Sequence, residues 1–467
     1  PLSAAAPLPQ EARVHPQVWE ALDAEGEAQI LILLRRQADL SDASTLRTRE
    51  ARGRYVYETL WAAAQETQQD LRSALDAQGI DHQSFYIVNA IKTRADAALV
   101  RSLAARHDVA QILPNPRVKG VPAHRPESSH EASLSTRAVD GVEENLIRVN
   151  ADDVWALGYT GQGIVVGGQD TGYEWEHPAL VNQYRGWDGA TADHDYNWHD
   201  AIHEDDPNTP TGNDCDFDSP EPCDDHLSSH GTHTMGIMVG AEGSSDQIGM
   251  APGAMWIGCR NMEQGWGTPA SYMECFEFFL APYPVGGTPA AGDPALAPHV
   301  VNNSWSCPPT EGCDVTSLAL LEASVEALRQ AGIMVVVSAG NYGPTCSSVH
   351  YPPAIYPLST AVGNFDHRTD QIQWSSSRGP VTYGGSTYIK PELSAPGYRV
   401  NSSKLDDNGE PTYGELSGTS MAAPHVAGAA ALLLSAAPGY SGHVGAIENL
   451  LLSSCLLYTS DAADDLA

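Results

Sequence analysis

The chain has 467 residues, enough for two or three domains, and a formal net charge of −34 at pH 7. This charge argues against a nucleic-acid partner, because phosphate binding needs a cationic surface. No run of eighteen or more apolar residues occurs, so the sequence predicts no membrane span.

The first residues, "PLSAAAPLPQ", follow no initiator Met and have no hydrophobic core of an export signal. We interpret residues 1–11 as the remnant of such a signal or a linker after it, and we expect a secreted, extracellular protein. Residues 1–140 have a net charge of −2 and the remainder −32. An acidic second half is typical of a secreted protein that binds Ca²⁺. Adaptation to high salt is an alternative that fits the balanced first half less well.

Residues 12–119 contain no cluster of catalytic side chains and predict one small α+β unit, which taken alone is a binding or folding module. Apolar spacing and turn residues predict an order that is similar to β-α-β-β-α-β. The expected elements are a strand at 28–36, a helix at 45–79, a strand at 85–94, a helix at 95–107 and a strand at 109–118.

Two segments outside the predicted domains need their own interpretation. Residues 120–140 are rich in Pro, Ser and His without periodicity, which predicts an exposed linker and a cleavage point. The segment "CLLYTSDAADD" (455–465) resembles the translation of a sequencing-adapter end. We therefore expect residues 455–467 to be non-native, and the domain at 141–454 to be truncated. A native acidic tail is the alternative.

In the second half, apolar runs lead directly into polar side chains. One run ends on Asp170, one ends on Asn341, and a stretch with His230 leads into a helix of small residues. Strands alternating with loops or helices predict an α/β domain with a mostly parallel sheet, whose functional sites gather at the carboxyl ends of the strands. The segments are "GIVVGGQDTGYEWEHPAL" (163–180), "SSHGTHTMGIMVG" (228–240) and "IMVVVSAGNYGP" (333–344).

A fourth segment, "LSGTSMAAPHVAG" (416–428), places Ser420 at the start of a helix among small residues. A serine hydroxyl becomes a nucleophile when a base lies within hydrogen-bond reach. His230 is a suitable base, and the carboxylate of Asp170 can hold its ring in the required tautomer. The helix start and the side-chain amide of Asn341 can stabilise an oxyanion. Each residue alone has a structural explanation, such as an N-cap for Ser420, but their combination predicts a catalytic site.

These motifs resemble those of the subtilisin-like serine proteases (subtilases, peptidase family S8), whose triad runs Asp, His, Ser along the chain. The segments "YNWHDAIH" (196–203), "CDDHLSSHGTHTMG" (223–236) and "YPPAIY" (351–356) resemble the bacillopeptidase F-like group. The resemblance covers roughly 141–454. It implies a subtilisin-like three-layer α/β domain, preceded by a small ferredoxin-like α+β domain similar to the I9-type inhibitor propeptides.

The resemblance also implies roles for individual residues. Asp170 orients His230, His230 is general base and acid, Ser420 is the nucleophile, and Asn341 polarises the carbonyl. His233 is then structural. Substrate would pair as an added strand with one segment and face a second segment across the pocket. The first is Ser304, Trp305 and Ser306, and the second is Ser338, Ala339 and Gly340.

The long loop at 187–227 is the main departure from minimal family members. It contains "NDCDFDS" (213–219), whose alternating carboxylates offer a Ca²⁺ patch without the spacing of an EF-hand. A solvated acidic loop is the stronger interpretation for this segment. Structural Ca²⁺ is expected because the family commonly uses it, but its site is unknown, and no cofactor is expected for catalysis.

The cysteines indicate an oxidising compartment. Cys215 with Cys223, and Cys259 with Cys275, are reasonable local pairs, whereas Cys307, Cys313 and Cys346 compete for one bond.

We expect a secreted serine endopeptidase made as a zymogen, with its own propeptide as inhibitor and protein or peptide substrates. We also expect a monomer, with neither a membrane nor a nucleic acid as partner. An acyl-enzyme ligase or transpeptidase is an alternative of the same class. A catalytically inactive protease-like binding protein is an alternative of another class, and its expected mark is a substituted triad. A sedolisin-type site is disfavoured, because His230 stands where the Glu base would.

Overall fold

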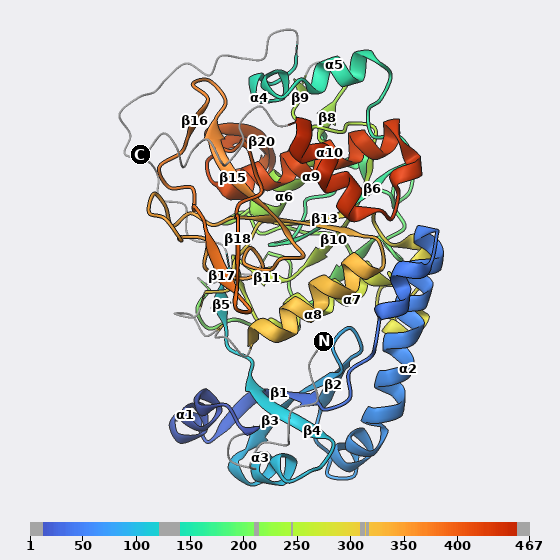
Figure 1. Cartoon of the computed structure of the whole chain (residues 1–467), viewed down its shortest axis with the longest axis vertical. Coiled ribbons are helices and arrows are strands. Elements are labelled where there is room, and N and C mark those ends of the chain that lie inside the picture. The colour runs from blue at the N-terminus through green and yellow to red at the C-terminus, as the bar shows by residue number, and fades with distance from the viewer. Residues whose placement is uncertain are drawn as a thin grey trace.

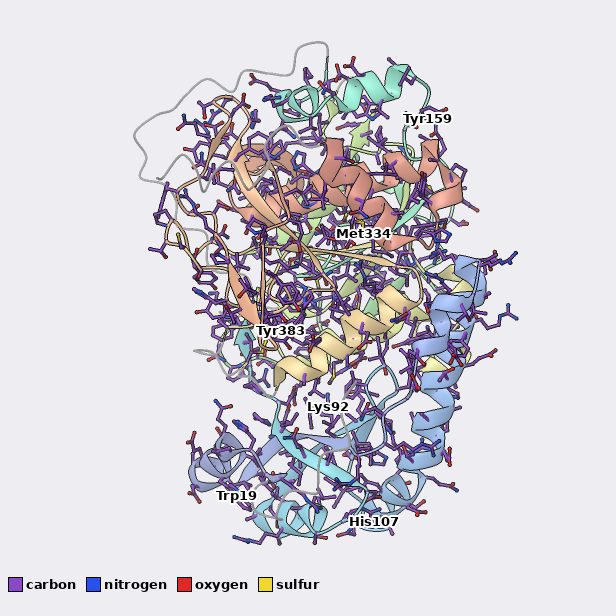
Figure 2. The ribbon with its side chains drawn as sticks, viewed as in Figure 1. Trp19, Lys92, His107, Tyr159, Met334 and Tyr383 are labelled. Carbon is purple, nitrogen blue, oxygen red and sulfur yellow. A yellow bond between two sulfur atoms is a disulfide. The ribbon has the colours of Figure 1, made fainter. Side chains whose placement is uncertain are left out.

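The computed structural model describes residues 13–120, 141–209, 214–243, 246–308, 313 and 317–454. Two domains are seen in Figure 1: a smaller N-terminal domain, drawn in blue, and a larger domain that begins at residue 141. The expected segments 1–11 and 455–467, and residues 121–140 of the expected linker at 120–140, lie outside the described residues. In Figure 2, Trp19 and His107 lie at the far end of the smaller domain, and Met334 belongs to the larger domain, where it is buried.

The N-terminal domain is a four-stranded antiparallel sheet of order β2-β3-β1-β4, with helices packed on it. This is the predicted β-α-β-β-α-β order, with ferredoxin-like pairing. Its elements are α1 (Pro16–Glu25), β1 (Glu27–Leu34), α2 (Arg49–Asp76), β2 (His82–Phe85), β3 (Ala90–Asp96), α3 (Ala97–Ala104) and β4 (Val109–Pro114), followed by β5 (Val118–Lys119).

Local signals explain where these helices begin. Thr48 caps α2 by accepting the amide of Ala51, and Asp96 caps α3 by accepting the amide of Leu99. The sequence analysis missed α1, although Pro16 at its first position and Gly26 at its left-handed end are typical boundary residues.

The predicted strand at 85–94 is confirmed only in part: residues 90–94 belong to β3, but residues 86–89 form a turn that separates β2 from β3. The turn amides of Tyr86 and Ile87 donate to the carboxylate of Glu277, which belongs to the larger domain; the bond from Ile87 is 2.9 Å. The chain turns here because its backbone donors are satisfied by another domain.

The larger domain is built around a sheet with the path β16-β15-β14-β13-β6-β10-β7, and β19 pairs beside β15. All of its pairings are parallel except β15 with β16. The helices are α4 (Glu144–Arg148), α5 (Ala151–Ala156), α6 (His230–Val239), α7 (Pro269–Leu280), α8 (Ser317–Gln330), α9 (Thr419–Ala436) and α10 (Val444–Ser454).

The strands of the larger domain are those of the central sheet and several short strands outside it. They are β6 (Val165–Asp170), β7 (Trp198–Asp200), β8 (Ala241–Glu242), β9 (Asp246–Gln247), β10 (Met255–Arg260), β11 (Met262–Glu263), β12 (Trp266–Gly267), β13 (Val300–Asn303), β14 (Met334–Ser338), β15 (Thr360–Asp366), β16 (Gln371–Ile372), β17 (Val381–Tyr383), β18 (Ser386–Tyr388), β19 (Leu393–Pro396), β20 (Val400–Leu405) and β21 (Pro411–Leu416).

Helices cover both faces of the central sheet, as the three-layer prediction requires. Successive residues of β14 show this, because Val336 packs in the core with α6 and α9, whereas Val335 and Val337 pack in the core with α7 and α8. Two glycines of β6 let large rings approach the sheet. A Cβ on Gly167 would lie 2.9 Å from the ring of Phe279, and one on Gly168 would lie 2.5 Å from the hydroxyl of Tyr173.

One apolar core continues across the two domains. Leu31, Phe85 and Tyr86 of the N-terminal domain pack in the same cluster as Phe276 of α7 and Leu328 of α8. The N-terminal sheet lies beneath α7 and α8 in Figure 1, and α2 runs along the side of the larger domain. The N-terminal domain therefore covers apolar surface that the larger domain would otherwise expose.

Three disulfides join Cys215 to Cys223, Cys259 to Cys275 and Cys307 to Cys313. The two local pairs of the sequence analysis are formed. Cys346 is a free, exposed cysteine.

Candidate active site

Asp170 and His230 meet at the carboxyl edge of the central sheet. Asp170 is the last residue of β6 and His230 is the first residue of α6. The Nδ1 atom of His230 lies 2.7 Å from Oδ1 of Asp170, and each side chain is 1% exposed. Burial alone would lower the pKa of His230, but the charge of Asp170 and the hydrogen bond to it outweigh burial and raise that pKa. The pair can thus stabilise an imidazolium.

Asp224 is a buried carboxylate that the sequence analysis did not select. It accepts hydrogen bonds from the hydroxyl of Thr171 at 2.8 Å and from the amide and hydroxyl of Thr232 at 2.9 and 2.6 Å. Thr171 follows Asp170, and Thr232 lies two residues after His230. Burial raises the pKa of Asp224 to about 7. Asp224 ties together the two segments that carry the Asp–His pair, and its signal was the acidic pair before the histidine motif.

Ser420 lies in the first turn of α9, with its side chain 6% exposed. By length and hydropathy α9 could span a membrane, but 78% of it is buried inside the protein, as expected of a core helix. The hydroxyl of Ser420 donates to the carbonyl of Ser304 at 3.2 Å, and the hydroxyl of Ser304 donates to the carbonyl of Ser420 at 2.8 Å. These reciprocal bonds join α9 to the segment after β13.

Asn341 lies three residues beyond the end of β14. Its Oδ1 atom accepts the amide of Thr419 at 2.9 Å and the hydroxyl of Thr419 at 3.1 Å. Because Oδ1 faces Thr419, the Nδ2 donor of Asn341 points away from Thr419. A Cβ on Gly418 would lie 3.3 Å from Nδ2, so the glycine keeps space open beside this donor.

A small pocket brings most of the predicted substrate-contacting residues together with Ser420 and Asn341. Its lining is Gly120, Ser304, Trp305, Ser306, Ser338, Gly340, Asn341, Tyr342 and Ser420. Asp170, His230 and Ala339 do not belong to this lining. Trp305 is 1% exposed and stacks on Tyr272, with ring centroids 4.0 Å apart and planes 13° apart, so a buried and stacked residue lines the pocket.

The end of the N-terminal domain occupies this part of the cleft. Strand β5 pairs antiparallel with β12, with Lys119 opposite Trp266 and Val118 opposite Gly267. On the other side, the amide of Ser306 donates to the carbonyl of Gly120 at 3.0 Å. Gly120, the first residue of the expected linker, is therefore buried in the cleft. Residues 118–120 therefore lie as an added strand between β12 and the segment that contains Ser306.

His233 is buried, and its Nε2 atom contacts the carbonyl of Gly414 at 2.9 Å. This contact agrees with a structural role on the inner side of α6.

The acidic loop does not form a good calcium site among the described residues. The carboxylates of Asp214 and Asp225 and the ring of His226 place one ligand atom each within 4.8 Å of one another. Asp214 is hydrogen-bonded to His226, and Asp225 accepts the side chain of Gln264 at 3.0 Å. Asp218 contacts His203 at 2.5 Å. Ca²⁺ prefers oxygen ligands, so these residues do not fit it, and the predicted Ca²⁺ site stays unassigned.

The chain is similar in sequence to known proteins of one family. A profile described as the Subtilase family matches residues 161–465. Bacillopeptidase F of Bacillus subtilis (strain 168) is 35% identical over 442 residues, which are 92% of this chain and 28% of that protein. The thermostable alkaline protease of Halalkalibacterium halodurans is 26% identical over 82% of this chain and 86% of its own length.

Subtilisin BL of Lederbergia lenta is 30% identical over 63% of this chain and 84% of its own length. The predicted resemblance to the bacillopeptidase F-like group is confirmed, although the chain spans about 28% of the length of bacillopeptidase F itself. The chain belongs to the subtilase family of subtilisin-like serine endopeptidases.

Proposed function

We propose that this chain is a secreted serine endopeptidase made as a zymogen, in which the N-terminal domain inhibits the larger domain until the chain is cut. The observation that carries the proposal is the added strand Val118–Gly120, whose last residue lines the same pocket as Ser420. A segment held between two strand partners beside a nucleophile has the position of a bound peptide.

Hydrolysis follows from the residues around that pocket. His230 takes the proton of the Ser420 hydroxyl while Oγ bonds to the substrate carbonyl carbon. This carbon becomes tetrahedral, and the electron pair of the C=O π bond moves to the carbonyl oxygen, which becomes an oxyanion. Nδ2 of Asn341 and the amides at the start of α9 stabilise that charge. The C–N bond then breaks as His230 returns the proton to the leaving amine. Water attacks the resulting ester by the same route, which releases the acid and restores the serine. Asp170 holds the imidazolium in place throughout.

The contacts between the domains support an inhibitory role for the N-terminal domain. Glu277 accepts the turn amides of Tyr86 and Ile87, and Glu274 accepts the side chain of Gln83 at 2.6 Å. Both glutamates lie on α7, whose N-terminus follows the β12 strand that pairs with β5. Docking of the N-terminal domain on α7 therefore delivers β5 to the cleft.

Secretion is part of the same proposal. The three disulfides are typical of an oxidising compartment. The proposed partners are protein or peptide substrates and the chain's own N-terminal domain, and the proposed state is a monomer.

A fluorophosphonate probe tests the proposal, because it reacts with an activated serine. The full chain is allowed to process, and the cut position is determined by N-terminal sequencing. The processed protein is then expected to label at Ser420 and to hydrolyse casein. The Ser420→Ala and His230→Ala variants are expected to stay uncut and unlabelled. Processed protein that neither labels nor cuts casein would refute the proposal.

A further inference from the structure

The residues around Gly120 leave no space for a side chain at this position. A Cβ built on this residue would lie 2.7 Å from the hydroxyl oxygen of Tyr272, 2.9 Å from Sδ of Met262 and 3.3 Å from the carbonyl oxygen of Ser306. A Cβ less than 3.0 Å from another heavy atom would force the backbone or the neighbouring side chain to shift. Gly120 does not have the left-handed φ that favours glycine. Space, and not backbone conformation, is therefore what limits this position to glycine.

Tyr272, the residue nearest to a Cβ at position 120, is held rigidly in place. Tyr272 and Trp305 are 0% and 1% exposed, and their rings stack at a centroid distance of 4.0 Å. The Tyr272 ring also lies against β12, since a Cβ on Gly267 would lie 2.8 Å from it. The tyrosine cannot turn away without disturbing both the stack and the strand. Met262 is also buried, but its thioether is flexible and can yield slightly.

The neighbouring position differs. The side chain of Lys119 is partly exposed, and its ammonium lies 5.5 Å from the centre of the Trp266 ring, so this position has room for a long side chain. The restriction belongs to the place of Gly120 and not to the whole added strand.

We propose that Tyr272 and Trp305 make the subsite at Gly120 selective for glycine, so that the preferred protein substrates have glycine at this position on the acyl side of the cut. This inference rests on the proposed function, because it assumes that a substrate takes the place of β5 and Gly120. It names Tyr272 as the residue that determines the selectivity.

The experiment uses protein processed from the full chain and peptides with the sequence of residues 114–128. One peptide keeps Gly120, two replace it by Ala or Leu, and a matched control replaces Lys119 by Leu. Overpacking predicts that kcat/KM falls about tenfold for Gly120→Ala and more than about a hundredfold for Gly120→Leu. The Lys119→Leu peptide is expected to stay within about threefold of the parent peptide. Competition of each peptide against casein hydrolysis gives the same ranking if a peptide is bound but not cut.

A variant of the protein tests whether Tyr272 causes the selectivity. Tyr272→Phe removes the nearest oxygen but keeps the stacked ring, so its processed form is expected to bring the Ala peptide to within about threefold of the Gly peptide. Equal cleavage or competition by the Gly and Leu peptides, in a protein that cuts casein, would overturn the inference. Unchanged discrimination in Tyr272→Phe would also overturn it. Failure to cut casein and to label Ser420 would instead refute the proposed function.

Discussion

The buried carboxyl of Glu277 predicts that docking of the N-terminal domain depends on pH. Burial raises the pKa of Glu277 to about 8, the amides of Ile87 and Tyr86 oppose the rise, and the charge of Glu274 adds to it. The perturbation is Glu277→Gln in the full chain with Ser420→Ala, which prevents processing. Glutamine keeps the shape and one acceptor oxygen but does not titrate.

The magnitude follows from the difference between the raised pKa and the ordinary value of 4.5. One pKa unit corresponds to about 1.4 kcal/mol, so the full difference is roughly 5 kcal/mol between the folded and the unfolded chain, and docking of the N-terminal domain accounts for a part of it. Because the pKa of Glu277 is raised, the contribution of this residue to the stability of the folded protein is complete below pH 4.5. It is lost as the pH rises to about 8. Protection of the β2–β3 hairpin should therefore fall over this range in the parent and change far less in the glutamine variant.

The assay is hydrogen exchange of peptides that cover residues 82–96, measured in both proteins at each pH between 5 and 9. Comparison at equal pH removes the intrinsic pH dependence of exchange. It also removes contributions that both proteins share, such as that of His203, whose pKa the charge of Glu274 raises to about 9. Parallel profiles for the two proteins would refute the reasoning that Glu277 titrates at this interface.

Four further predictions test the site and its support. Asn341→Ala should lower kcat roughly 10²- to 10³-fold in casein or peptide assays with little change in KM, and an unchanged kcat would exclude it as an oxyanion donor. The raised pKa of His230 should place the acid limb of the pH–kcat/KM profile above pH 6.5, since the base must be neutral; a limb below that value would contradict the Asp170 effect. Cys215→Ser should lower the free energy of unfolding by about 2–3 kcal/mol in urea titrations of the non-processing chain, and no loss would mean that the loop is held by other contacts. Gly231→Ala should unfold or disable the protein, because its Cβ would lie 2.1 Å from the carbonyl of Gly172; full activity would show that α6 can shift.

The sequence predicted the elements that carry the site because each polar residue follows a strong local pattern. An apolar run ending in Asp170 is a buried strand, and a run of small residues after His230 or Ser420 is a helix. Parallel strands then bring such ends to one edge of the sheet. The structure places Asp170 and His230 in contact there, and Ser420 and Asn341 on one pocket.

Contacts between distant segments could not be predicted in this way. The turn at residues 86–89 depends on Glu277, almost two hundred positions later, so local periodicity continued the strand through it. Asp224 looked like one more carboxylate of an acidic loop until its threonine donors were located. Gly120 resembled the start of a linker rich in Pro, Ser and His, because nothing in its neighbours reveals the ring of Tyr272.

The strand Val118–Lys119 follows β4 of the N-terminal domain along the chain and belongs to the same molecule as the cleft that it occupies. Its concentration around the cleft is therefore fixed by chain geometry and does not change when the protein is diluted. Under the proposed zymogen, the first cut would be a first-order event within a single molecule, with a half-time independent of how much protein a cell exports.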